Sequence, residues 1–281
     1  MAKARSTSFR TLPLLQSRRP LNFLLPLCLC LRRAQSQKVH SAADRTATWQ
    51  FGEAFLKVKD LNEQEARCTR EHVTLARLHA RGGWTTFDLP RVLYHGLWDN
   101  NRYVLLTTAV RGRTFGSWWP SMNEEMKNRC VNRVIEACKE RLSGRAGGRS
   151  YTNDDLVAAS KEMGMNCYVP FHFYHCDLGP GNILVDVKEG DDDGRSISNG
   201  IIDWEIAGFV PWEWIMTKFR VSAGLDLPWQ GDSRLEYRRR VRLKMGELGF
   251  PDVVDAFTAR KSSSIAVPLT ASGTRGGQSG R

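Results

Sequence analysis

The sequence lacks the features that mark disulfide-bonded, zinc-binding and membrane-spanning proteins. Its cysteines are odd in number and form no C-x-x-C pair; they are Cys28, Cys30, Cys68, Cys130, Cys138, Cys167 and Cys176. Such spacing favours reduced thiols in a cytosolic-type compartment. The pair His172-x-x-His175 has no matching Cys/His pair elsewhere, so the sequence does not predict a zinc site. The apolar segment at residues 21–31 is interrupted by Pro26, and it is too short for a spanning helix, which needs about 20 apolar residues.

Acidic residues are absent from residues 1–43, which carry eight Lys/Arg. Most of the net charge of +11 therefore lies there, and the other 238 residues carry only +3, which does not favour a nucleic-acid partner. We interpret residues 1–44 as a basic leader that is either disordered, misassigned or a targeting segment. No clean cleavage site for a secretory signal follows Leu31, whereas the arginine-rich composition suits a mitochondrial presequence. We expect a cytoplasmic protein, with mitochondria as the alternative.

The polar residues with the clearest chemical pattern lie between residues 172 and 205. This stretch contains His175-x-Asp177, then Asn182, then Asp203 behind two isoleucines. Residues 183–185 and 201–202 read as two short strands, and the acidic, glycine-flanked segment 189–194 reads as the turn between them. In an antiparallel hairpin of this length, Asn182 and Asp203 would lie side by side at the open end, with Asp177 on the loop that leads in.

Two carboxylates and a carboxamide that converge in this way suit Mg²⁺, which takes oxygen ligands and keeps substrate phosphates in its shell. Phosphoryl transfer needs such a site because its transition state spreads negative charge over the phosphoryl oxygens. In this scheme Asn182 and Asp203 hold the metal, and Asp177 orients or deprotonates the accepting hydroxyl. His175 belongs to the same candidate catalytic motif. The simpler alternative is a surface hairpin with an acidic turn and an ordinary Asn cap.

The segments HCDLGPGNILVD and GIIDWEIAGFVP resemble the aminoglycoside phosphotransferase family, and especially its fungal members of unassigned substrate. The resemblance is close over residues 171–211, fair over 51–112 and 213–257, and absent before about 44 and after about 260. It implies an α+β, two-lobed, protein-kinase-like fold. The N-lobe would be a small antiparallel sheet at 45–110, the C-lobe would be mainly helical at 111–260 and contain the catalytic loop and metal site, and residues 261–281 would be a disordered tail.

The same resemblance assigns the nucleotide-binding residues. Lys57, in the predicted hairpin 46–59, would be the strand lysine that reaches the phosphates of ATP, and Lys59 is the alternative. Glu71, in the predicted helix 65–80, would orient that lysine, with Glu65 as its rival. The strands predicted at 90–98 and 103–108 would lead into a linker near 108–110, whose backbone would bond adenine.

Two family elements are not recognisable in the sequence. No glycine-rich stretch precedes Trp49, so the first strand and the phosphate loop of the N-lobe are missing from the predicted fold. A protein kinase would have D-F-G where this chain has Asp203-Trp204-Glu205, and A-P-E further on. These differences favour a small-molecule kinase over a protein kinase. They also leave a second hypothesis, a pseudokinase-like module that binds a nucleotide or a partner.

The function predicted from these residues is transfer of the γ-phosphate of ATP, with Mg²⁺, to a hydroxyl of a small molecule. A polycationic aminoglycoside would require a carboxylate-rich site. Residues 206–260 hold nine Lys/Arg and seven Asp/Glu, which is no acidic bias. The acceptor is therefore left as a small-molecule hydroxyl. Further helices are predicted at 122–143, 154–164, 215–224 and 235–247.

Overall fold

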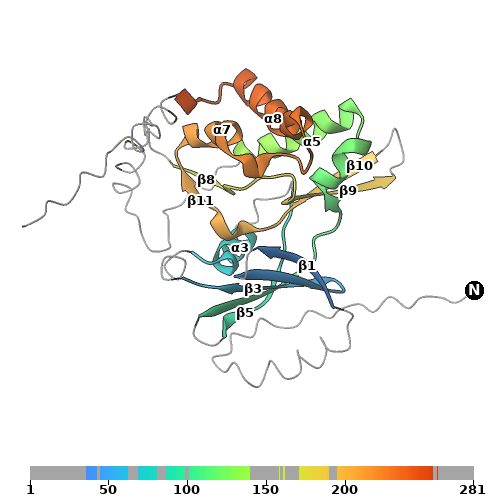
Figure 1. The fold of residues 1–281 in the computed structure, drawn as a ribbon, viewed down its shortest axis with the longest axis vertical. Coiled ribbons are helices and arrows are strands. Elements are labelled where there is room, and N and C mark those ends of the chain that lie inside the picture. The colour runs from blue at the N-terminus through green and yellow to red at the C-terminus, as the bar shows by residue number, and fades with distance from the viewer. Residues whose placement is uncertain are drawn as a thin grey trace, which may run out of the picture. The chain divides into compact units, whose positions relative to one another are not determined.

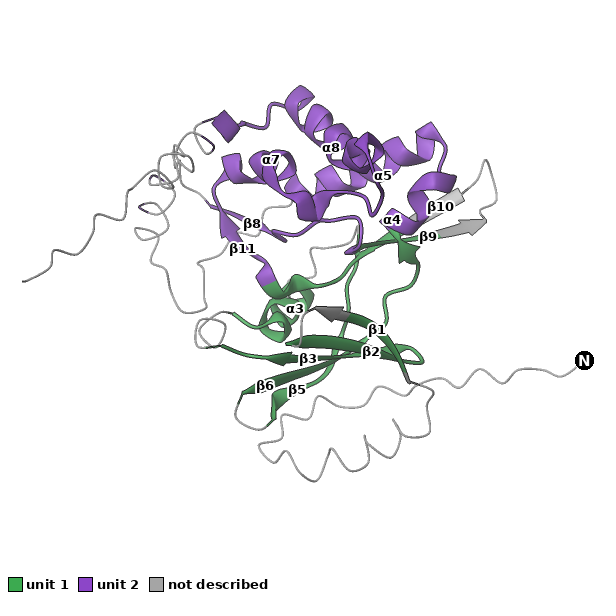
Figure 2. Cartoon of the chain, in the orientation of Figure 1, with its two compact units in different colours: residues 1–114, 183–205 green, residues 115–182, 206–281 purple. Residues whose placement is uncertain are grey.

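The computed structural model in Figure 1 describes residues 36–42, 45–62, 69–80, 87–98, 101–139, 158, 161, 171–189, 195–255 and 258. The chain divides into two compact units (Figure 2). Unit 1 joins Met1–Thr114 to Ile183–Glu205, and unit 2 joins Phe115–Asn182 to Ile206–Arg281. Four predicted segments lie wholly or mostly outside the described residues: the leader up to 35, most of the helix at 154–164, the turn at 190–194 and the tail at 261–281.

Unit 1 contains a five-stranded antiparallel sheet, with strand order β1-β2-β3-β6-β5 (Figure 2). The strands are β1 (Ser36–Ala42), β2 (Thr46–Phe51), β3 (Ala54–Asp60), β5 (Val92–Trp98) and β6 (Arg102–Thr108). Strand β6 is buried from Tyr103 to Thr107 because it has a neighbour on both sides. Helix α3 (Glu71–Ala80) buries Glu71, Thr74, Leu75 and Leu78. This spacing forms one stripe along the helix, so Glu71 lies on the buried face.

Strand β1 lies within the segment that the sequence analysis assigned to the leader. Its register runs from Ser36 opposite Phe51 to Ala42 opposite Thr46, so it is the edge strand beside β2. The described side chains at 37–40 are all exposed. The strand is therefore held by backbone pairing and not by an apolar face. That is why a hydrophobic pattern does not predict it.

The predicted hairpin at the polar motif is confirmed. Its strands are β9 (Ile183–Glu189) and β10 (Arg195–Ile201), with Ile183 opposite Ile201 and Glu189 opposite Arg195. Two short strands extend this second sheet, β4 (Phe87–Asp88) beside β10 and β7 (Arg113–Thr114) beside β9. Gly112, just before β7, has φ +112°, and a Cβ atom there would lie 2.6 Å from the carbonyl oxygen of Val185. Only glycine fits this close approach of two backbones.

Unit 2 is mainly helical. Its longer helices are α5 (Glu124–Lys139), α7 (Trp212–Val221) and α8 (Glu236–Glu247); shorter turns are α4 (Phe115–Trp118), η1 (Trp119–Ser121), η3 (Ala223–Leu225) and η4 (Asp232–Leu235). Strands β8 (His172–Tyr174) and β11 (Gly208–Val210) form an antiparallel pair. The rings of Phe115, Trp119, Phe219 and Tyr237 pack edge to face in its core.

Helix α5 starts two residues later than predicted because Asn123 caps it. The Asn123 Oδ1 atom accepts a hydrogen bond of 2.8 Å from the Met126 backbone N–H. Helix α7 starts three residues earlier than predicted, directly after Pro211. None of the described helices is both long and apolar enough to cross a membrane.

Candidate active site

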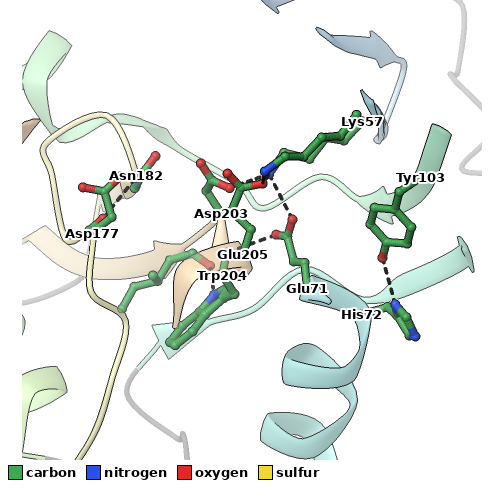
Figure 3. Close-up of polar contacts among 11 residues, drawn as sticks. Lys57, Glu71, His72, Tyr103, Asp177, Asn182, Asp203, Trp204 and Glu205 are labelled. Atoms are coloured by element: carbon green, nitrogen blue, oxygen red, sulfur yellow. Dashed lines mark hydrogen bonds and ion pairs between the residues drawn. The ribbon is translucent and has the colours of Figure 1, made fainter. Parts of the chain in front are cut away.

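Lys57 lies at the centre of a cluster of charged side chains in unit 1 (Figure 3). It stands in the middle of β3, opposite Thr48 of β2 and Leu105 of β6. Its Nζ atom donates to Glu71 Oε2 at 3.0 Å and to Glu205 Oε2 at 3.2 Å, and it also pairs with Asp203 Oδ1. Three carboxylates from two separate parts of the sequence therefore meet at one ammonium group.

Glu71 is the fixed partner of Lys57. Its side chain is only 7% exposed, and its second oxygen, Oε1, accepts a hydrogen bond of 3.1 Å from the Trp204 backbone N–H. Trp204 is fully buried, and its indole Nε1 donates to the Ile201 carbonyl at 2.9 Å. Glu71 thus bridges the strand lysine and the segment that follows β10. The pairing of Lys57 with Glu71 is the one that the family resemblance predicted, and Glu65, its rival, lies outside the described residues.

Asp203 and Glu205 are the exchangeable partners. Their side chains are 35% and 29% exposed, so solvent or a ligand can reach them. One oxygen from each of Glu71, Asp203 and Glu205 lies within 4.8 Å of the others, a spacing that could hold a metal ion. The sequence analysis did not assign Glu205 a role. It turns toward Lys57 because residues 204–206 form the 3₁₀ turn η2 (Trp204–Ile206), which the local sequence did not predict.

The charge state of Lys57 follows from this cluster. Burial alone would lower its pKa, but the negative charges of Glu71, Asp203 and Glu205 outweigh burial and raise the pKa above that of an ordinary lysine. Lys57 is therefore an ammonium ion at any physiological pH. It can serve as an anion-binding group and not as a base.

In unit 2, Asp177 and Asn182 lie on the loop after β8. Asn182 Nδ2 donates to the Asp177 carbonyl and to Asp177 Oδ2, each at 3.0 Å (Figure 3). The Asn182 backbone N–H donates to the Gly179 carbonyl at 3.0 Å, which closes the turn through Gly179-Pro180-Gly181. The turn therefore brings together the predicted base and one of the two predicted metal ligands.

His175 is buried and lies behind this loop. Its Nδ1 atom accepts a hydrogen bond of 3.2 Å from the Asp177 backbone N–H. This contact suits a side chain that positions the loop. Cys176, between the two, is no candidate nucleophile, because burial raises the pKa of its thiol to about 11.

Backbone strain coincides with the predicted site residues. Among the described residues, the non-glycine positions with positive φ are Cys176, at 65°, and Asp203, at 64°. Such conformations are costly for residues with a Cβ atom and are concentrated at functional sites. One of these positions precedes Asp177, and the other is a predicted metal ligand.

A distant helix anchors the catalytic loop. Tyr237 of α8 is fully buried, and its hydroxyl donates to the Leu178 carbonyl at 2.8 Å. Gly179 allows close packing on the other side, since a Cβ atom there would lie 2.7 Å from the Gly224 carbonyl oxygen. The sequence analysis missed Tyr237. It stands 59 residues from Leu178, and no local pattern links the two positions.

The linker predicted to bond adenine, at residues 108–110, follows β6. The Ala109 N–H donates to the Glu53 carbonyl at 2.7 Å, and the Thr108 N–H donates to the Arg91 carbonyl at 2.9 Å. Both N–H groups are thus engaged within unit 1. Adenine binding at this linker stays a prediction.

Two stacked histidines join helix α3 to strand β5. The rings of His72 and His95 stack with centroids 3.7 Å apart, and His72 Nδ1 lies 2.8 Å from Tyr103 Oη. Burial, together with the neighbouring His95 and Arg70, lowers the pKa of His72 to about 4. His72 is therefore neutral at pH 7, and its ring shares a hydrogen bond with the Tyr103 hydroxyl.

This cluster predicts a loss of stability in acid. The unfolded chain takes up the His72 proton near pH 6.5, whereas the folded chain resists it until about pH 4. The free energy of unfolding should therefore fall as the pH drops through that window. Urea unfolding of His72→Gln should show a shallower dependence on pH than the natural chain. An equally steep dependence in the variant would contradict this assignment.

Comparison with solved structures identifies the fold of this chain. No protein-family model and no curated protein sequence matches the chain. The solved structures that match include the aminoglycoside phosphotransferase APH(4)-Ia, at 16% identity, with 85% of this chain and 87% of that chain covered and a TM-score of 0.56. Another is APH(3'')-Id from Streptomyces rimosus, at 15% identity, 84% and 96% coverage and a TM-score of 0.52.

A third match is the GDP complex of aminoglycoside 2'-phosphotransferase-IIIa, at 15% identity, 86% and 87% coverage and a TM-score of 0.52. The chain therefore has the kinase-like α+β fold of these proteins, as the sequence resemblance predicted.

Proposed function

We propose that this chain, which has the fold of the aminoglycoside phosphotransferases, transfers the γ-phosphoryl group of ATP to a hydroxyl of a small molecule. The observation that carries the proposal is the ammonium of Lys57, held by buried Glu71 beside the exposed carboxylate of Asp203. A strand lysine fixed by a helix glutamate next to an acidic residue is the arrangement that kinases use to bind nucleotide phosphates. Solved neighbours were crystallised with ADP and hygromycin B, or with ATP and streptomycin.

Each predicted residue has a role that its contacts support. Lys57 binds phosphate oxygens, and Glu71 keeps Lys57 in position. Asp177 accepts or orients the proton of the attacking hydroxyl. Asn182 positions Asp177 through Nδ2, and its carboxamide oxygen Oδ1 is the atom suited to a cation.

Asn182 and Asp203 both offer oxygen atoms, the ligands that Mg²⁺ prefers, and two further carboxylates, Glu71 and Glu205, lie beside Asp203. When bound, Mg²⁺ would neutralise charge on the transferred phosphoryl group. Asp203 would hold the cation through its carboxylate oxygens. Glu71 holds Lys57 independently of Asp203, because it has its own contacts with Lys57 Nζ and with the Trp204 N–H.

The acceptor is proposed only as a small-molecule hydroxyl. The balanced charge of residues 206–260 does not favour a polycation.

The second candidate function is a nucleotide- or partner-binding module without turnover. One observation favours it: residues 43–45, which connect β1 to β2, contain no glycine.

Binding of Mg·ATP separates the kinase from a module that binds only a partner, and turnover separates it from a module that binds a nucleotide without reaction. A ligand at a hundredfold excess over its Kd should stabilise the folded chain by about 2.7 kcal/mol, so the melting temperature of the full chain should rise with ATP and Mg²⁺ together. The Mg²⁺-dependent part of that rise should vanish in Asp203→Asn. Glu125→Gln, the same kind of charge loss on the exposed face of α5, should retain it. A folded chain that shows no shift with millimolar Mg·ATP would refute the kinase proposal.

A further inference from the structure

The three residues between β1 and β2 do not have the glycine-rich sequence of the loop with which kinases usually bind phosphates. Ala42 pairs with Thr46, which leaves residues 43–45, with the sequence Ala-Asp-Arg. A glycine-rich loop binds phosphate through backbone N–H groups, and this requires a close approach that side chains prevent. A nucleotide bound to this chain therefore needs another source of positive charge.

Lys59 supplies a second cation on the same face as Lys57. The two residues are two apart on β3, so their side chains project from the same side of the sheet. Lys59 Nζ lies 3.5 Å from Glu205 Oε2, and Lys57 Nζ lies 3.2 Å from the same oxygen. Two ammonium groups thus converge on one oxygen atom.

The carboxylate that they share is well suited to being displaced. Glu205 is 29% exposed, whereas the Lys59 side chain is 19% exposed and the Lys57 side chain 17%. A phosphate group offers more negative charge and more acceptor oxygens than one carboxylate, so it competes favourably for both lysines. The Glu205 oxygen marks a point where an anionic oxygen is already bound by two cations.

We propose that Lys59 is a second phosphate-binding residue, which acts with Lys57 on the nucleotide phosphates in place of a glycine-rich loop. Glu205 is the internal counter-ion that holds the two lysines together until a nucleotide arrives. The inference rests on the proposed function, because it assumes that Lys57 faces a nucleotide. It adds a binding residue that the sequence analysis treated only as an alternative to Lys57.

Calorimetric titration of the full chain tests this assignment with three probes: Mg·ATP, inorganic tripolyphosphate and adenosine. Lys59→Gln should raise the Kd for Mg·ATP and for tripolyphosphate by roughly tenfold to a hundredfold, as expected for a hydrogen bond between charged groups. The Kd for adenosine should not change. Lys59→Arg, which keeps the charge, should recover most of the affinity for the two phosphate compounds.

Lys38→Gln is the matched control, since it removes one charge from an exposed side chain on β1 of the same sheet. The double variant Lys59→Gln/Glu205→Gln restores the local charge balance, and it should show the same phosphate-specific loss even if the single variant is unstable. Suppose that Lys57→Gln weakens Mg·ATP binding, while Lys59→Gln and the double variant bind Mg·ATP as tightly as Lys38→Gln does. The inference is then wrong and the proposed function stands. If the natural chain binds no Mg·ATP, both fail together.

Discussion

Asp177→Asn should lower the turnover number by about 10²- to 10⁴-fold, the usual contribution of a general base. The substitution keeps the shape of the side chain and an oxygen that can accept the hydrogen bond from Asn182 Nδ2, now 3.0 Å long. The loop also keeps its anchors, the Tyr237 hydroxyl on the Leu178 carbonyl and the His175 ring on the Asp177 N–H. The fold and the affinity for Mg·ATP should therefore change little.

The measurement is ADP production from ATP, with water as the acceptor and then with any alcohol that accelerates it. Asp232→Asn provides the control, because it makes the same chemical change at an exposed position of unit 2. Unchanged turnover in Asp177→Asn would remove Asp177 from the mechanism. A parallel loss of nucleotide binding would instead mean that the loop had collapsed.

Trp204→Ala should destabilise the chain by about 3–5 kcal/mol, the cost of removing a large aromatic side chain from a packed interior. Trp204 is fully buried, and its indole donates to the Ile201 carbonyl at the end of β10. Trp204 directly follows Asp203, and Ile201 lies two residues before it. The Asp203 backbone has a strained, positive φ. The same substitution should therefore loosen the segment that carries Asp203 and Glu205.

Equilibrium unfolding in urea measures this loss. Trp98→Ala is the comparison, because Trp98 lies in the same unit and is half exposed, so its removal should cost far less. Trp204→Phe, which keeps most of the apolar volume, should fall between the two. Equal costs for Trp204→Ala and Trp98→Ala would show that Trp204 does not support the site.

The parts that the sequence predicted well are those with a strong local pattern. The hairpin at 183–201 has apolar strands around an acidic, glycine-flanked turn, and its register follows from that symmetry. Lys57 and Glu71 were assigned by the family resemblance, which implies a strand lysine that is oriented by a helix glutamate. Their ion pair joins positions only 14 residues apart.

The parts that the sequence did not predict depend on contacts between distant segments. Strand β1 has exposed side chains, Gln37, Lys38, Val39 and His40, and is held by the row of backbone partners that β2 offers. Glu205 meets Lys57 across 148 positions of sequence, and Tyr237 meets Leu178 across 59. No period of two or of 3.6 residues encodes such pairs, so only the folded chain reveals them.

Strand β1 also has a consequence for how this protein behaves in solution. As the outermost strand of its sheet, it covers the hydrogen-bonding edge of β2 and presents Gln37, Lys38, Val39 and His40 to water. Its register is broken between Lys38 and His40. Charged side chains and irregular pairing on an outer strand discourage a second molecule from adding its own strand. Any shortened form that begins after Ala43 would uncover the straight edge of β2 and favour self-association through it.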